Sequence, residues 1–200
     1  AILNPGDEII VVQPCYVNYA PLAELCQAKV IPLDSSINGY YPTAEQIKNA
    51  ITPKTKAIML CSPNNPTGTM IPANELEKIA KVVVENEIWC ISDEIYCELA
   101  YDGAKHTSIG SFEGMKDFAI ILNGFSKSFA MTGWRIGYIA GPKDLLAQIV
   151  KLHGYNTICA PIFSQYGATE GLRNCFKDVE KMRISYQQRR NLMYKAFCDM

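Results

Sequence analysis

Several familiar functional motifs are missing from this sequence of 200 residues. It has no CxxC pair and only two histidines, so its eight scattered cysteines lack the paired spacing of a zinc site. It contains no GxxxxGK[ST] phosphate loop, no GxGxxG after a strand, no serine nucleophile elbow and no HExxH. We therefore expect no metal ion, no phosphate-loop nucleotide site and no dinucleotide site of the GxGxxG type.

Strong charge and long apolar runs are missing as well. The formal net charge is −1 and the one short basic run is QQRR near the C-terminus, which argues against a nucleic-acid partner. No apolar run approaches the length of a membrane span. Scattered cysteines in a chain of this length are typical of reduced thiols, so we expect a cytoplasmic protein.

The apolar residues that are present form short segments of strand length. These segments are nearly continuous rather than alternating, as expected of strands that are covered on both faces. Helical patterns separate them, which predicts an α/β fold with a doubly wound, mostly parallel sheet. The predicted strands are 8–12, 29–33, 56–61, 88–92, 118–122 and 136–140.

Helix signals lie between these strands. Thr43 and Gln46 have the spacing of a capping box, and Gly154 is expected to end a helix. One face of the third predicted helix carries Leu76, Ile79, Ala80 and Val83. The predicted helices are 17–28, 43–51, 74–87, 143–153 and 178–197.

Polar and ionisable residues follow four of the predicted strands. In a doubly wound sheet, ligands bind at the carboxyl ends of the strands, so these four segments are expected to meet at one edge. The segments are QPCYVNY (13–19), SPNNPTG (62–68), SDEIYCEL (92–99) and NGFSKSF (123–129).

An acid, a phenol, an amide, an amine and a guanidinium stand at or beyond these strand ends: Asp93, Tyr96, Asn65, Lys127 and Arg135. A lysine can form a Schiff base when its surroundings lower its pKa. A pyridine cofactor needs an acid at its ring nitrogen, and a phosphate group needs a bidentate cation. Taken singly, the acid could cap a turn, the amide could belong to a plain turn, and the guanidinium could form a surface ion pair.

Three ordered segments carry a resemblance to a known family. SPNNPTG, SDEIY and SKSFAMTGWRIGY resemble the signatures of the class I pyridoxal-phosphate aminotransferases, the aspartate/aromatic aminotransferase family. The spacings fit too, with 28 residues from Asn65 to Asp93 and 34 from Asp93 to Lys127. The resemblance covers nearly the whole chain and implies the large domain of fold type I with pyridoxal 5'-phosphate as cofactor.

The resemblance implies a role for each of the central residues. Lys127 would be the Schiff-base lysine, and it would also move a proton between the substrate α-carbon and the cofactor. Asp93 would pair with the pyridinium nitrogen. Tyr96 and Asn65 would hydrogen-bond the phenolic oxygen of the ring, and Asn65 would also reach the substrate carboxylate.

Three further residues would complete the cofactor site by the same resemblance. Arg135 would bind the phosphate with help from Ser126, and Tyr16 would stack on the ring. Two positions depart from the family pattern. Gly124 stands where many relatives have a phosphate-binding serine, and Tyr16 stands where aspartate-specific members often have tryptophan.

The resemblance also implies how this chain would fit into a longer one. Residues 1–176 would belong to the large cofactor-binding domain, and 177–200 would begin a helix leading to a small domain absent from this sequence. That domain supplies the arginine that holds the substrate α-carboxylate, so these 200 residues alone should be nearly inactive. We expect a homodimer when the protein is full length, with the loop 154–161 facing the partner's site.

The implied reaction moves an amino group between an amino acid, aspartate-like or aromatic, and a 2-oxo acid. Three alternatives stay open: a C–S β-lyase with the same fold and cofactor, a non-catalytic effector domain, and a fragment that never binds cofactor. Trp134 is expected in the core, and His106 and His153 are interpreted as structural residues.

Overall fold

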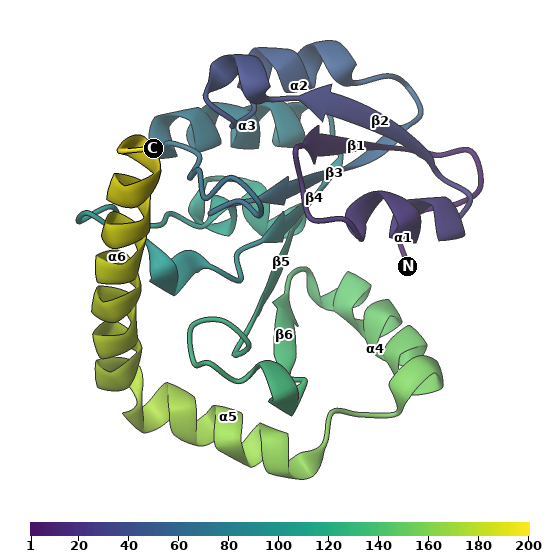
Figure 1. The fold of residues 1–200 in the computed structure, drawn as a ribbon. Helices are drawn as coiled ribbons and strands as arrows, with labels where there is room; N and C mark the ends of the chain where they lie inside the picture. The colour runs from purple at the N-terminus through teal and green to yellow at the C-terminus, as the bar shows by residue number, and fades with distance from the viewer.

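The computed structural model describes all residues from 1 to 200, and its centre is a six-stranded sheet (Figure 1). The strand order is β2-β1-β3-β4-β5-β6, with every neighbouring pair parallel except β5 and β6. This arrangement confirms the predicted α/β fold with a doubly wound, mostly parallel sheet. The strands are β1 Glu8–Gln13, β2 Lys29–Asp34, β3 Thr55–Cys61, β4 Trp89–Asp93, β5 Ala119–Gly124 and β6 Gly137–Ala140.

Side-chain alternation along the strands builds two cores, one on each face of the sheet. Ile10 and Ile58 face the larger cluster of 17 buried residues, which contains the apolar faces of helices α2 (Ala44–Ala50) and α3 (Ala73–Glu85). Val11 and Ala57 point the other way, into a cluster of five that includes Ala23 of helix α1 (Tyr19–Leu25). Both faces of the central strands are therefore covered, which explains their unbroken apolar runs.

The sixth strand does not share this burial. The sequence predicts that 136–140 is covered on both faces, but all four residues of β6 are exposed, so that expectation is wrong. β6 is an antiparallel edge strand that pairs with β5 alone, and no helix of this chain buries it. Its apolar residues therefore indicate a surface and not a core.

Six α-helices accompany the sheet (Figure 1). The capping box at the start of α2 is confirmed: the Thr43 hydroxyl accepts from the Gln46 N–H at 3.2 Å, and the Gln46 side chain accepts from the Thr43 N–H at 2.9 Å. All four residues predicted on the apolar face of α3 are buried. The helices are α1 Tyr19–Leu25, α2 Ala44–Ala50, α3 Ala73–Glu85, α4 Lys143–Thr157, α5 Ile162–Asn174 and α6 Phe176–Cys198.

In the C-terminal part, one predicted helix end is wrong and one helix was missed. Helix α4 runs through Gly154, whose carbonyl accepts from the N–H of Ile158 at 3.2 Å, and the helix ends where Ile158 adopts a left-handed φ of 63°. The predicted loop 154–161 is therefore helical up to Thr157. Helix α5 was not predicted at all, because Gly167 and Gly171 interrupt its apolar pattern.

Candidate active site

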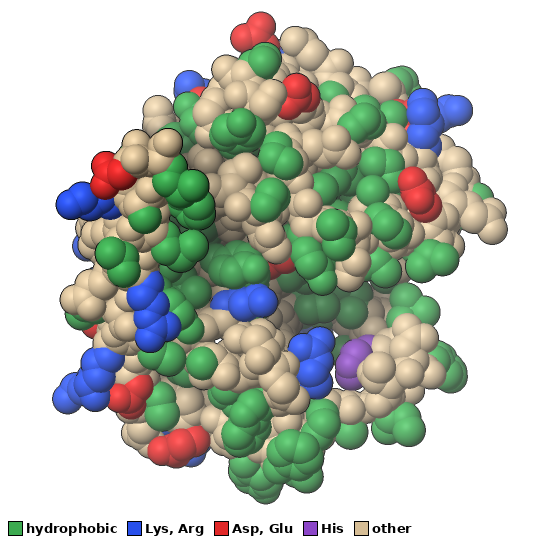
Figure 2. Space-filling view, in the orientation of Figure 1, with side chains coloured by type: hydrophobic (Ala, Val, Ile, Leu, Met, Phe, Trp, Pro, Cys, Tyr) green, Lys and Arg blue, Asp and Glu red, His purple; other side chains and the backbone are tan.

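A cavity of about 420 Å³ opens at the carboxyl edge of the sheet. Its walls come from the segments after β1, β3, β4 and β5, the four strand ends that the sequence indicates. The face in Figure 2 is hollowed at its centre, with Lys or Arg side chains beside the hollow and an acidic group visible inside. The structure brings all seven predicted site residues together in the lining of this cavity: Tyr16, Asn65, Asp93, Tyr96, Ser126, Lys127 and Arg135.

Asp93 is the last residue of β4, and hydrogen bonds fix both oxygens of its carboxylate. Oδ1 accepts from the N–H of Ile95 at 3.1 Å, and Oδ2 accepts from the hydroxyl of Tyr19 at 2.7 Å. Each oxygen keeps a lone pair, so the carboxylate can accept a further hydrogen bond from a ligand. Asp93 is therefore an oriented acceptor rather than a mobile surface acid.

Tyr19 is a site residue that the sequence reasoning missed. It lies at the start of α1, and its ring meets that of Tyr16 edge-on with centroids 5.6 Å apart. Burial raises the pKa of Tyr19, and the nearby Cys61 and Asp93 raise it further, so the phenol stays neutral and donates. Its role depends on a tertiary contact with Asp93, 74 residues away, so no local sequence pattern marks it.

Cys61 lies beside Asp93 because these residues pair across β3 and β4. Burial raises the pKa of the Cys61 thiol to about 11, so the sulfur is neutral at physiological pH. The thiol contacts the carbonyl of Pro63 at 3.4 Å. We assign it to packing beneath the acid rather than to nucleophilic chemistry.

Lys127 lies three residues after the end of β5 and is partly buried. Its amine forms none of the seven ion pairs, and its Nζ atom makes no hydrogen bond with the protein. Nζ lies 5.8 Å from the ring centroid of Tyr96, whose own pKa is raised chiefly by burial. The cavity therefore presents an unpaired amine next to a neutral phenol.

Arg135 also lines the cavity and directly follows the short 3-10 helix η5 (Thr132–Trp134). Its backbone has a left-handed φ of 51°, and its Nη1 donates to the carbonyl of Thr132 at 2.9 Å. The guanidinium has no carboxylate partner among the ion pairs, so its remaining N–H groups are available to an anion.

Trp134 is not a core residue, contrary to expectation, since 43% of it is exposed. Its ring lies against helix α5, where a Cβ added to Gly167 would approach it within 2.7 Å. The hydroxyl of Ser164, on the same face of α5, donates to the Trp134 carbonyl at 2.7 Å. The helix that sequence reasoning missed thus supports the turn that carries Arg135.

Gly124 departs from the family pattern for a steric reason. It pairs with Gly137 in the antiparallel ladder of β5 and β6, and an added Cβ would lie 2.9 Å from the Gly137 Cα. A serine at position 124 would therefore require the two strands to move apart. That this position supplies fewer phosphate contacts stays a prediction.

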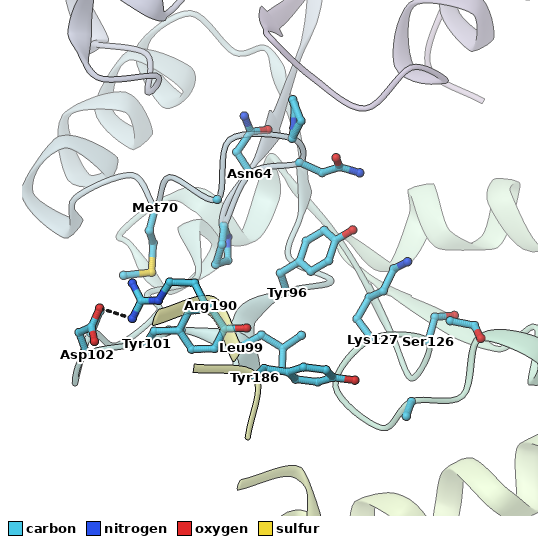
Figure 3. Close-up of a pocket in the computed structure, with 18 residues that line it drawn as sticks. Asn64, Met70, Tyr96, Leu99, Tyr101, Asp102, Ser126, Lys127, Tyr186 and Arg190 are labelled. Carbon is cyan, nitrogen blue, oxygen red and sulfur yellow. Dashed lines mark hydrogen bonds and ion pairs between the residues drawn. The ribbon is translucent and has the colours of Figure 1, made fainter. Parts of the chain in front are cut away.

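A second cavity of about 780 Å³ adjoins the first (Figure 3). The two cavities share five lining residues: Asn65, Tyr96, Ser126, Lys127 and Thr132. Helix α6 forms its far wall. There the Arg190 guanidinium pairs with Asp102 at 2.6 Å, as the dashed line in Figure 3 marks. This second arginine is therefore engaged, unlike Arg135.

The two histidines lie outside both cavities. His106 Nε2 is 3.0 Å from a carboxylate oxygen of Glu94, and His153 on α4 contacts the hydroxyl of Thr157 at 2.9 Å. The structural interpretation of both residues remains a prediction, which these contacts support. No helix of the chain is both long enough and apolar enough to cross a membrane.

The cavity contents suit a pyridoxal cofactor. An unpaired amine suits an aldehyde, a carboxylate held by two donors suits a protonated ring nitrogen, and an uncompensated guanidinium suits a phosphate. These three groups come from different parts of the chain and line one cavity, so the fit does not depend on a single residue.

Comparison with known proteins agrees with this fit. The chain matches the family "Aminotransferase class I and II" over residues 1–199. It is 44% identical over 201 residues to the putative aminotransferase YugH of Bacillus subtilis (strain 168), and 40% identical over 203 residues to an aspartate aminotransferase of Pyrococcus abyssi. Each alignment covers 100% of this chain and 52% of the relative, so the chain spans about half the length of these relatives.

Solved structures show the same likeness. The aromatic aminotransferase of Pyrococcus horikoshii OT3 superimposes with a TM-score of 0.94 at 39% identity, over 98% of this chain and 54% of that one. Thermus thermophilus aspartate aminotransferase with maleate superimposes with a TM-score of 0.94 at 37% identity, over 99% of this chain and 52% of that one. The family implies pyridoxal phosphate as cofactor. The chain belongs to the class I and II aminotransferase family.

Proposed function

We propose that this protein is a pyridoxal-phosphate-dependent aminotransferase that moves an amino group between an amino acid, aspartate-like or aromatic, and a 2-oxo acid. One observation carries the proposal: an unpaired lysine, an oriented carboxylate and an uncompensated arginine share one cavity. Relatives named as aspartate and aromatic aminotransferases support the reaction and the two substrate classes.

When bound, the cofactor supplies an aldehyde for covalent attachment and a ring that stabilises negative charge at the substrate α-carbon. We infer that Lys127 would be the Schiff-base lysine that holds the cofactor through its aldehyde. Its Nζ atom would also remove and return the proton on the substrate α-carbon. Its lack of a protein partner leaves it available for both tasks.

The other residues then bind and orient. Asp93 holds a proton at the ring nitrogen, with Tyr19 fixing its direction. Tyr96 and Asn65 hydrogen-bond the phenolic oxygen, and Asn65 also contacts the substrate carboxylate. On the phosphate side, Arg135 and Ser126 bind oxygens, while Tyr16 stacks on the ring. These roles are proposals that rest on the shared cavity and on the family resemblance.

Turnover by these 200 residues alone is inferred to be slow. Of the cations lining the two cavities, Lys127 and Arg135 are assigned to the cofactor, and Arg190 is already paired with Asp102. No free cation remains for the substrate α-carboxylate, and its loss removes both binding and orientation. This supports the inference that 1–176 are the cofactor-binding part of a larger enzyme and that 177–200 lead into a second domain.

The whole protein is proposed to be a cytoplasmic homodimer. All eight cysteines are free, as expected in a reducing compartment. Helices α4 and α5 expose large apolar side chains, among them Tyr155 at 90% and Tyr166 at 71%, and a second copy could cover them. Sedimentation of the protein at several concentrations tests the dimer.

Transfer of ¹⁵N from labelled aspartate or phenylalanine to 2-oxoglutarate tests the proposed reaction. We expect labelled glutamate that depends on added pyridoxal phosphate and on Lys127, at a rate far below that of the Pyrococcus abyssi relative. Release of pyruvate and sulfide from cysteine without amino transfer would instead identify a β-lyase. A colourless protein that does not bind the cofactor would refute the proposal and support a purely structural fragment.

A further inference from the structure

A second carboxylate, Glu94, lies immediately after Asp93 and is 4% exposed. Its Oε1 accepts from the hydroxyls of Ser92 at 3.1 Å and Ser108 at 2.9 Å, and from the N–H of Ile109 at 3.3 Å. Its Oε2 lies 3.0 Å from His106 Nε2. A buried carboxylate is costly unless it is hydrogen-bonded, and here four partners satisfy it.

These partners come from separate parts of the chain. Ser92 belongs to β4, while His106, Ser108 and Ile109 lie in the segment that leads into the 3-10 helix η3 (Ile109–Ser111). The other ring nitrogen of His106 is buried and has no partner, so Glu94 is the one side chain that holds this imidazole. Glu94 therefore joins the end of β4 to a loop twelve or more residues away.

The junction lies directly behind the cofactor cavity. Asp93 lines the cavity whereas Glu94 does not, as expected of consecutive residues whose side chains point to opposite faces. The backbone N–H of Glu94 also donates to the carbonyl of Leu122 in β5 at 2.9 Å. The hydrogen bonds of Glu94, on the side away from the cavity, therefore fix the backbone segment that carries Asp93 and Tyr96 into the cavity lining.

We propose that Glu94 and His106 are positioning residues that hold Asp93 toward the cofactor ring nitrogen. The proposal rests on the cofactor site described above, and it assigns His106 a part in cofactor binding from outside the cavity. It differs from a general packing role because it predicts an effect that depends on the ring nitrogen itself.

The test compares two ligands: pyridoxal phosphate and its deaza analogue, in which C–H replaces the ring nitrogen. Their dissociation constants are measured by absorbance titration for the wild type, Glu94→Gln, His106→Phe and His106→Gln. Lys105→Ala is the matched control, because Lys105 is an exposed neighbour of His106 whose side chain makes no hydrogen bond or ion pair. The thermal midpoint of each cofactor-free variant reports folding separately.

We expect Glu94→Gln and His106→Phe to weaken pyridoxal phosphate binding about tenfold and analogue binding less than twofold. His106→Gln keeps an N–H donor and should bind pyridoxal phosphate within threefold of the wild type. Lys105→Ala should bind pyridoxal phosphate as tightly as the wild type does. If Glu94→Gln or His106→Phe fails to fold, Ser108→Ala removes one donor more gently and should weaken pyridoxal phosphate alone, two- to threefold.

Equal losses for both ligands would overturn the proposal, because they indicate collapse of the whole cavity. Unchanged pyridoxal phosphate binding in folded Glu94→Gln and His106→Phe would overturn it as well. A wild type that binds neither ligand would refute the proposed function and this inference together. A wild type that prefers pyridoxal phosphate while the variants keep that preference would refute the inference alone.

Discussion

The chain divides at the end of β5 into two regions that are stabilised differently. Both apolar core clusters are built entirely from buried residues between 9 and 119. Helix α3 buries five of its residues in that core, whereas helix α4, which is slightly longer, buries none. The first region is a closed core, and the second is a set of helices with uncovered apolar surfaces.

This difference shows what an apolar pattern can and cannot tell. The sequence predicts a helix at both α3 and α4, but this chain buries residues of α3 alone. The proposed homodimer would supply the cover for α4 and α5. The cavity lies where the regions meet, with Asp93 from the first and Lys127 and Arg135 from the second.

The largest effect on folding is expected from the closed core. Ile79 is fully buried in α3, so Ile79→Ala should lower the free energy of unfolding by about 2–5 kcal/mol through lost burial and a residual cavity. Urea denaturation measures this change. A loss below about 1 kcal/mol would mean that the first region is not a tightly packed core.

A smaller effect is expected where the first region meets the cofactor. Tyr19→Phe removes the hydroxyl that donates to Asp93 and should weaken pyridoxal phosphate binding about tenfold, since hydrogen bonds to charged groups contribute about 1.5–3 kcal/mol. Tyr40→Phe is the control, because Tyr40 is an exposed tyrosine outside this cavity. Equal binding by both variants and the wild type would show that Asp93 does not need Tyr19.

The contact between α2 and α3 should make stability depend on pH. A hydrogen bond from the Ala44 N–H, helped by Lys78, holds the pKa of Glu75 below its usual value. A lowered carboxyl pKa contributes stability above the unfolded value of about 4.3, and this is lost as pH falls through the folded value.

Glu75→Gln should therefore reduce stability by no more than about 1 kcal/mol at pH 7, and by less at lower pH. Urea denaturation of both proteins at pH 7 and pH 4 checks the sign. A difference that grows toward acid would contradict the assignment.

The smallest effect is expected in the second region. Leu152 on α4 is 48% exposed, so Leu152→Ala should change stability by less than about 0.5 kcal/mol when the protein is dilute enough to be monomeric. This substitution in the second region is the comparison for Ile79→Ala in the first. If the proposed dimer is correct, the same substitution should weaken self-association at higher concentrations, whereas a large loss in the monomer would remove the contrast between the regions.

The helices and strands of the first region could be predicted from the sequence more fully than those of the second. Continuous apolar runs and the capping box at Thr43 have local causes, so they can be seen without coordinates. Helix α5 was missed because it contains Gly167 and Gly171. These glycines leave room for the rings of Trp134 and Phe129, which are distant in sequence. Tyr19 and Glu94 were missed for a similar reason: their importance lies in tertiary contacts, and no local pattern marks them.

The central claim is that the amine of Lys127 anchors the cofactor's aldehyde. The most direct measurement adds pyridoxal phosphate, reduces the protein with borohydride and maps the modified peptides by mass spectrometry. The account predicts one dominant modified site, Lys127, and loss of that signal in Lys127→Ala. Modification spread evenly over other lysines, or unchanged in Lys127→Ala, would contradict it.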